Sequence, residues 1–168
     1  MEKAKGVRML ILDVDGVMTD GSLPYNDAGA EGKVFHVHDG LGIVLLMREN
    51  IKVAIISGRK SKAVEFRAQE LGITEIHQAV KDKLATFEEI IKRDTISKDE
   101  VAFMGDDLVD LPLLSRVGFA VSVPDAPEEI KERVDYVTKR DGGKGAVREV
   151  CELILKAQGK WEKWCLPT

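Results

Sequence analysis

Four short, continuous apolar runs constrain the fold of this chain more than any other feature. Apolar runs without polar alternation are typical of strands buried on both faces, as in a parallel sheet. Segments with the apolar spacing of a helix lie between the runs, so strand and helix alternate along the chain. The sequence therefore predicts an α/β fold, a Rossmann-like doubly wound parallel sheet. The predicted strands are Met9–Leu12, Val53–Ile56, Val101–Met104 and Gly118–Val121.

Helices are predicted where apolar residues recur three or four positions apart. The pair Leu71-Gly72 indicates a helix that ends in a glycine cap, and Ser97–Glu100 is a turn signal before the third strand. The predicted helices are Leu41–Arg48, Ala63–Leu71, Leu84–Ile91 and Ile130–Val134, and a further helix begins at Ala146.

The length of the chain is typical of one domain. A chain of 168 residues with 44% hydrophobic residues can bury a substantial core without disulfides or structural metals. No stretch after Asp15 or after Ser57 is long enough to form an inserted cap domain. We therefore expect residues 1–168 to form a single cap-less domain.

Two segments depart from the alternating pattern. Residues 18–37 are rich in Gly, Asp and Asn, with Asn26–Gly29 between two short runs, which predicts a projecting β-hairpin. The tail, residues 158–168, carries Trp161 and Trp164 among lysines. Exposed aromatic residues need a surface to bury against, either on their own domain or on a neighbouring chain.

The charge balance bears on the class of partner. The 29 acidic and 25 basic residues give a net charge of −4 and are mixed along the sequence, so no large basic surface is available for nucleic acid. The apolar run near the N-terminus is too short for a signal peptide or a membrane span. We expect a cytoplasmic protein with reduced thiols at Cys151 and Cys165, a small-molecule partner and no membrane partner.

Polar residues follow each of the first three apolar runs. Asp13 and Asp15 follow the first run, 57–59 (Ser-Gly-Arg) the second, and Asp106 the third; Lys83 begins the helix between the second and third. In open α/β sheets, ligands bind beyond the carboxyl ends of the strands. These residues are therefore expected to meet in one crevice.

The residue types at these positions are suited to phosphate ester cleavage. Asp13 can attack phosphorus if a cation bridges it to the phosphoryl oxygens, and Asp106 completes an oxygen-rich site that suits Mg²⁺. Asp15 can protonate the departing alkoxide and later remove a proton from water. Ser57, with the adjacent Gly58 backbone N–H, can hold a phosphoryl oxygen, and Lys83 can neutralise the charge.

Four cations near the predicted strand ends are candidates for contacting a substrate carboxylate. Arginine can hold a carboxylate with two parallel hydrogen bonds, and lysine offers a point charge. Glycines at the start of the helix from Ala146 expose backbone N–H groups to an anion or serve only as flexible turns. The candidate cations are Arg59, Lys60, Arg140 and Lys144.

The ordered motifs resemble those of the haloacid dehalogenase superfamily of phosphohydrolases, whose DxDx(T/V), Ser/Thr, Lys and GDDxxD elements appear here in sequence. The resemblance implies that Asp13 is the nucleophile and Asp15 the acid/base. It also implies that Asp13, Asp106 and the Asp15 carbonyl hold Mg²⁺. Asp107 and Asp110 of the last motif are expected to support the metal site, and Asp110 alternatively orients Lys83.

Three further segments, 37–42, 105–112 and 141–149, narrow the resemblance. They are similar to the 3-deoxy-D-manno-octulosonate 8-phosphate phosphatases of lipopolysaccharide sugar synthesis. This resemblance implies hydrolysis of an eight-carbon sugar-acid phosphate and a cap-less homotetramer in which a neighbour's hairpin covers each active site.

Other functions remain possible at this point. A related phosphatase would act on a nine-carbon, sialic-acid-type phosphate by the same mechanism. A receiver-type signalling domain also combines aspartates, Mg²⁺ and a lysine, but its lysine comes last, whereas Lys83 precedes Asp106. A catalytically idle phosphate-binding or interaction domain would release no phosphate, so an assay with Mg²⁺ separates it from an enzyme.

Overall fold

The structure is a computed structural model that describes residues 2–166. Its centre is a parallel sheet of six strands in the order β3-β2-β1-β4-β5-β6, which confirms the predicted fold class. The strands are β1 (Met9–Leu12), β2 (Lys52–Ile56), β3 (Glu75–His77), β4 (Val101–Met104), β5 (Phe119–Ser122) and β6 (Tyr136–Val137).

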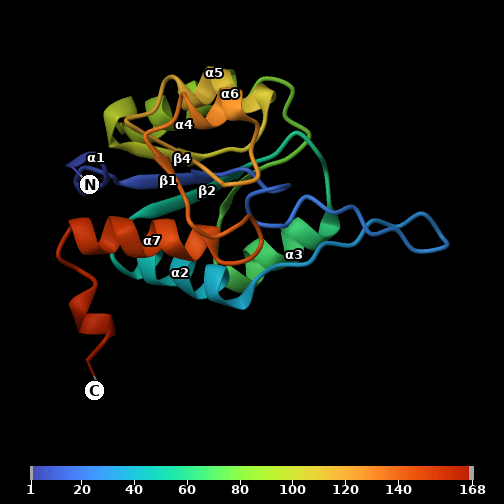
Figure 1. Ribbon diagram of the computed structural model, residues 1–168, viewed down its shortest axis with the longest axis horizontal. Helices are drawn as coiled ribbons and strands as arrows, with labels where there is room; N and C mark the ends of the chain where they lie inside the picture. The colour runs from blue at the N-terminus through green and yellow to red at the C-terminus, as the bar shows by residue number, and fades with distance from the viewer. Residues whose placement is uncertain (1, 167–168) are drawn as a thin grey trace.

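Helices cover both faces of the sheet, as Figure 1 shows. One layer holds α2 (Val37–Arg48), α3 (Lys62–Leu71) and α7 (Ala146–Ala157), and the other holds α4 (Lys83–Asp94), α5 (Leu111–Leu114) and α6 (Glu128–Lys131). The remaining elements are α1 (Glu2–Lys5) and three 3-10 turns, η1 (Lys98–Glu100), η2 (Leu108–Asp110) and η3 (Glu162–Trp164).

The centre of the sheet positions the candidate site. Every residue of β1, β4 and β5 is buried, as expected for strands covered by helices on both faces. Leu12 at the end of β1 lies beside Ile55 of β2 and Met104 of β4. The strand order reverses at β1, and this switch point is where open α/β sheets bind ligands.

The two edge strands were missed by the sequence analysis. β3 and β6 contain only three and two residues, and all of them are half-buried. Such short pairings produce no continuous apolar run that could be told from a loop. The predicted helix Ile130–Val134 also had the wrong bounds, because α6 begins at Glu128 directly after Pro127 and ends at Lys131.

Residues 18–37 project from the sheet as a hairpin-shaped loop (Figure 1), but they form no two-stranded ladder. A single antiparallel bridge joins Tyr25 to Glu31, and the Asn26 side chain accepts hydrogen bonds from the backbone of Ala28 and Ala30. The predicted chain reversal at Asn26 is therefore present. The predicted strands are absent because Pro24 lacks an N–H and most of the loop is exposed and polar.

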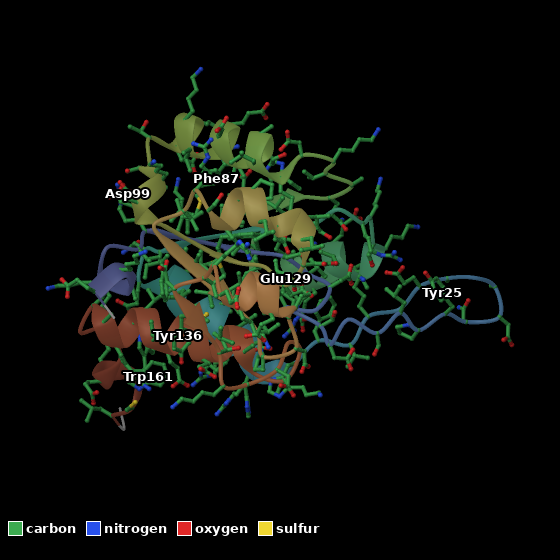
Figure 2. The ribbon with its side chains drawn as sticks, turned by 45° about the horizontal axis from the view of Figure 1, so that its top comes forward. Tyr25, Phe87, Asp99, Glu129, Tyr136 and Trp161 are labelled. Carbon is green, nitrogen blue, oxygen red and sulfur yellow. The ribbon has the colours of Figure 1, made fainter. Side chains whose placement is uncertain are left out.

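The aromatic tail packs on its own domain. Trp161 and Trp164 lie half-buried against the core. The Arg148 guanidinium lies 5.2 Å from the ring centre of Trp161, and Lys163 forms an ion pair of 2.7 Å with Glu49. Figure 1 shows this end of the chain opposite the projecting loop, and Figure 2 labels Trp161 in the tail and Tyr25 in the loop. The last two tail residues, 167 and 168, lie outside the described part of the chain.

No helix within residues 2–166 is both long enough and apolar enough to cross a membrane.

Candidate active site

The carboxylate of Asp13 lies at the carboxyl end of β1. Its backbone N–H donates to the carbonyl oxygen of Met104 at 3.0 Å, which extends the β1–β4 ladder by one residue and fixes where the side chain leaves the sheet. Asp13 is buried, with 7% of its surface exposed. Asp13 therefore lines the crevice with a carboxylate that is largely shielded from water and whose backbone is fixed by the sheet.

Lys83 reaches Asp13 from the first residue of α4. The start of this helix is fixed by Asp82, whose side chain accepts a hydrogen bond from the Ala85 N–H at 3.0 Å. The Lys83 ammonium lies 2.9 Å from Asp13 Oδ1 and 2.7 Å from Asp110 Oδ1. Although burial alone would lower it, the pKa of Lys83 is raised because these two carboxylates favour the charged form.

Asp110 holds this part of the site together. It is fully buried, and its second oxygen accepts hydrogen bonds from the backbone N–H groups of Asp106 and Asp107. A Cβ atom on Gly105 would lie 2.7 Å from this carboxyl group, so glycine leaves the space that Asp110 fills. Of the two roles expected for Asp110, its contacts favour the orientation of Lys83.

Asp13, Asp106 and Asp110 form a cluster that could hold a metal ion, with one oxygen of each within 4.8 Å of the others. Asp110 is already occupied by Lys83 and two backbone N–H groups. Asp13 and Asp106 therefore remain as the candidate carboxylate ligands. Asp107 instead caps η2, since its side chain accepts a hydrogen bond from the Leu108 N–H at 2.7 Å.

The electrostatics of this cluster favour a bound cation. Burial raises the pKa of Asp13 to about 6, opposed by Lys83 and reinforced by Asp110. Burial, followed by repulsion from Asp13, raises the pKa of Asp106 to about 7. Asp13 is buried and Asp106 half-buried, and the two carboxylates resist ionisation side by side. They offer oxygen ligands whose charge a divalent ion would balance, so their chemistry fits Mg²⁺.

Ser57 lies across the crevice, after β2. Its N–H donates to the carbonyl oxygen of His77 at 2.9 Å, and its hydroxyl accepts a hydrogen bond from the Arg59 N–H. The crevice has a volume of about 320 Å³. Its lining includes most of the predicted site residues: Asp13, Asp15, Ser57, Gly58, Arg59, Lys83, Asp106 and Asp107.

Lys60, Arg140 and Lys144 are not among the residues that line this crevice. Lys144 pairs with Asp141 at 3.5 Å. The nearby glycines serve packing, because a Cβ on Gly142 would lie 1.8 Å from the Gly16 carbonyl oxygen. The N-terminus of α7 is also occupied, since the Arg148 N–H donates to the Asp39 carboxylate at 2.7 Å. This geometry favours the structural interpretation of the glycine-rich segment.

Three residues of the projecting loop reach the site without having been predicted. The Lys33 ammonium contacts the Asp15 carboxylate and lies 2.8 Å from Glu31, whose other oxygen pairs with Arg59. The Arg59 guanidinium also lies 3.2 Å from the Tyr25 hydroxyl. A charged residue in a polar loop has no sequence signal that separates it from a solvated one, so only the fold reveals these contacts.

Comparison with known proteins gives consistent matches. Residues 62–150 match the haloacid dehalogenase-like hydrolase family, a range that contains Lys83 and Asp106. The chain is 48% identical over 161 residues to the 3-deoxy-D-manno-octulosonate 8-phosphate phosphatase KdsC of Escherichia coli K12. This alignment covers 96% of the chain and 86% of the relative.

Two solved structures are also similar to this chain in both sequence and fold. The 3-deoxy-D-manno-octulosonate 8-phosphate phosphatase of Yersinia pestis is 46% identical with a TM-score of 0.94, covering 96% of this chain and 87% of that one. The Moraxella catarrhalis enzyme of the same name is 45% identical with a TM-score of 0.96, covering 98% and 94%. That enzyme was solved in complex with a magnesium ion, a phosphate ion and a KDO molecule.

Proposed function

Since this chain belongs to the haloacid dehalogenase-like hydrolases, we propose that it is a Mg²⁺-dependent phosphatase that converts 3-deoxy-D-manno-octulosonate 8-phosphate to the free sugar acid and phosphate. The observation that carries the proposal is the cluster of Asp13, Lys83 and Asp106 at the switch point of the sheet. The likeness to phosphatases of this substrate along nearly the whole chain supports the sugar acid.

The metal site in this proposal consists of Asp13, Asp106 and the backbone carbonyl of Asp15. All of these donors are oxygens, which suits a hard cation. Mg²⁺ bound there neutralises charge that would otherwise keep the Asp13 carboxylate from a phosphate dianion. Lys83 supplies a further positive charge, 2.9 Å from Asp13.

The reaction proceeds in two displacements. Asp13 attacks phosphorus, the bond to the sugar oxygen breaks, and Asp15 donates a proton to that oxygen as the sugar acid leaves. Asp15 then takes a proton from a water molecule that attacks the aspartyl phosphate. The bond between phosphorus and Asp13 breaks, which releases phosphate and restores both carboxyl groups. Ser57 and the Gly58 N–H hold the phosphoryl oxygens during both steps.

We also propose that the chain works as a cytoplasmic homotetramer. The projecting loop carries apolar side chains that lie largely in solvent in a single chain: Leu23 is 40% exposed, Tyr25 59% and Val34 72%. Such residues favour association. In the tetramer, the tip of one loop covers the crevice of a neighbour and shapes a site that no cap domain encloses. The free thiols of Cys151 and Cys165 suit a reducing compartment.

Phosphate release tests the proposal. The purified chain is assayed with Mg²⁺ on the eight-carbon sugar-acid phosphate, on a nine-carbon sialic-acid-type phosphate and on a neutral hexose phosphate. We expect the highest kcat/KM on the first, no turnover after chelation, and at least a roughly 10⁴-fold loss in Asp13→Asn, which lacks the nucleophile. Preference for the nine-carbon substrate would reassign the substrate, and wild-type turnover by Asp13→Asn would refute the mechanism.

A further inference from the structure

Four charged side chains form a closed ring above the crevice. Lys33 joins the carboxylates of Asp15 and Glu31, and Glu31 pairs with Arg59 through its other oxygen. Arg59 closes the ring, with its Nε 3.7 Å from Asp15 Oδ2. The ring alternates acid and base and draws on three segments: the loop after β1, the projecting loop and the loop after β2.

Lys33 is the buried member of this ring. Its side chain is only 1% exposed, whereas that of Arg59 is 45% exposed. A buried ammonium needs charged partners to offset its lost hydration, and Asp15 and Glu31 supply them. Because its two partners lie on either side, the Lys33 ammonium cannot move without giving up a contact. It therefore fixes the position of the Asp15 carboxylate.

The two oxygens of Asp15 have different surroundings. Oδ1 is hydrogen-bonded to Lys33, while the nearest cation to Oδ2 is the Arg59 guanidinium, beyond hydrogen-bond distance at 3.7 Å. Asp15 and Arg59 both line the crevice. One oxygen is thus anchored to the projecting loop, and the other accepts no side-chain hydrogen bond from the described residues.

We propose that Lys33 is a positioning residue for the phosphatase reaction: it anchors Asp15 through Oδ1 so that Oδ2 exchanges the proton with the leaving group and with water. The inference rests on the proposed function, because it gives Asp15 the proton-transfer role. Lys33 itself touches neither the phosphate nor the nucleophile. Its effect on the rate passes through Asp15 alone, and this separates it from a residue that merely holds the loop in place.

The first experiment compares Lys33→Met with the wild-type protein. Methionine approximates the aliphatic part of the lysine side chain and lacks the ammonium group. Because misplacing an acid/base group slows chemistry more than binding, we expect kcat to fall about 10- to 100-fold while KM stays within about twofold. Lys33→Arg should recover part of kcat. Lys98→Met, an exposed lysine at the opposite end of β4, serves as the matched control and should retain wild-type kcat.

A double-mutant cycle then tests whether Lys33 acts through Asp15. In the Asp15→Asn background the acid/base group is already lost, so adding Lys33→Met should change kcat by less than about twofold. An equal loss in both backgrounds would show that Lys33 only supports the fold, and it would overturn the proposal. Wild-type kcat in Lys33→Met would overturn it as well.

Two further measurements cover the cases in which Lys33→Met does not fold or the sugar-acid phosphate is not a substrate. If Lys33→Met does not melt cooperatively, Glu31→Gln replaces it in the same cycle, because it removes one anchor of Lys33 and keeps the shape; no kcat loss there would count against the proposal. Para-nitrophenyl phosphate is assayed alongside the sugar-acid phosphate. Activity on the aryl ester alone would refute the proposed substrate but leave the Lys33 comparison intact. Activity on neither would overturn both proposals.

Discussion

Lys83 and Asp110 form a buried ion pair of 2.7 Å in which the aspartate is fully enclosed and also accepts two backbone hydrogen bonds. Asp110 thus links the loop after β4 to the first turn of α4, and the ion pair keeps Lys83 beside Asp13.

Asp110→Ala should lower the free energy of unfolding by about 3 to 5 kcal/mol, because two buried backbone N–H groups lose their acceptor and the buried Lys83 ammonium loses one of its two carboxylate partners. Urea denaturation without Mg²⁺ measures the change. Asp27→Ala, at the exposed tip of the projecting loop, is the control and should stay within about 0.5 kcal/mol of wild type. A similar small effect for Asp110→Ala would refute the structural role of the pair.

The stabilisation by Mg²⁺ should increase with pH. The pKa values of Asp13 and Asp106 are raised from 3.8 to about 6 and about 7, so the folded metal-free protein holds protons that the unfolded chain has lost. These two groups therefore cost stability progressively as the pH rises through that window. Mg²⁺ offsets this cost by replacing the protons. Melting curves with and without Mg²⁺ should diverge from about pH 5.5 to about pH 8; a constant difference would contradict the assignment.

Asp106→Asn should abolish the Mg²⁺-induced rise in Tm and also raise the Tm of the metal-free protein at pH 8. The amide removes a carboxylate whose pKa is raised to about 7 by burial and by Asp13, and which is therefore ionised at a cost at this pH. Thermal melting at pH 8 and at pH 5 provides the test, since the gain should shrink at the lower pH. A variant less stable than wild type at pH 8 without metal would show that Asp106 is not under strain.

Arg59 and Lys144 should differ in their effect on substrate selection. Arg59 lines the crevice and Lys144 does not, so only Arg59 can reach a sugar carboxylate there within one chain. Arg59→Gln should reduce kcat/KM for the sugar-acid phosphate about 10- to 100-fold more than for a neutral sugar phosphate. Lys144→Gln is the matched control. Equal losses on both substrates for Arg59→Gln would assign it to phosphate binding or to the loop.

The projecting loop should determine the oligomeric state. Replacing Leu23, Val34 and Val37 by serine removes exposed apolar surface. These substitutions leave the Tyr25 hydroxyl and its contact with Arg59 in place. Light scattering at micromolar concentration should give a mass near four chains for the wild type and a smaller mass for the triple variant, with reduced kcat/KM. A fully active wild-type monomer would refute the proposed assembly.

The residues predicted best from the sequence are those that follow long buried strands. Asp13 follows β1 directly and Asp106 follows β4 after Gly105, and the apolar run of each strand indicates where that strand ends. Lys83 was predicted from its order between the acidic motifs. All three meet in the structure, because parallel strands in register bring their carboxyl ends to one edge.

Side-chain positions that depend on contacts between distant segments could not be predicted from the sequence. Lys33 lies in a loop whose composition indicates solvent, yet its side chain is buried by Asp15 and Glu31. Arg140 and Lys144 follow the end of the sheet in sequence, but the turn that carries them packs through Gly142 on the loop after β1. Local residue patterns do not indicate which distant segments come into contact.

The close approach of Gly142 to the Gly16 carbonyl oxygen joins a segment that is synthesised late to one that is synthesised early. The residues proposed to react, from Asp13 to Asp106, are synthesised before the glycine turn that packs on the loop after β1. The hydrogen bond from the Gly143 N–H to the Val17 carbonyl oxygen, at 3.0 Å, forms only afterwards. A nascent chain that has not yet reached Gly142 therefore has the residues proposed to react, but not the turn that packs against the loop after β1.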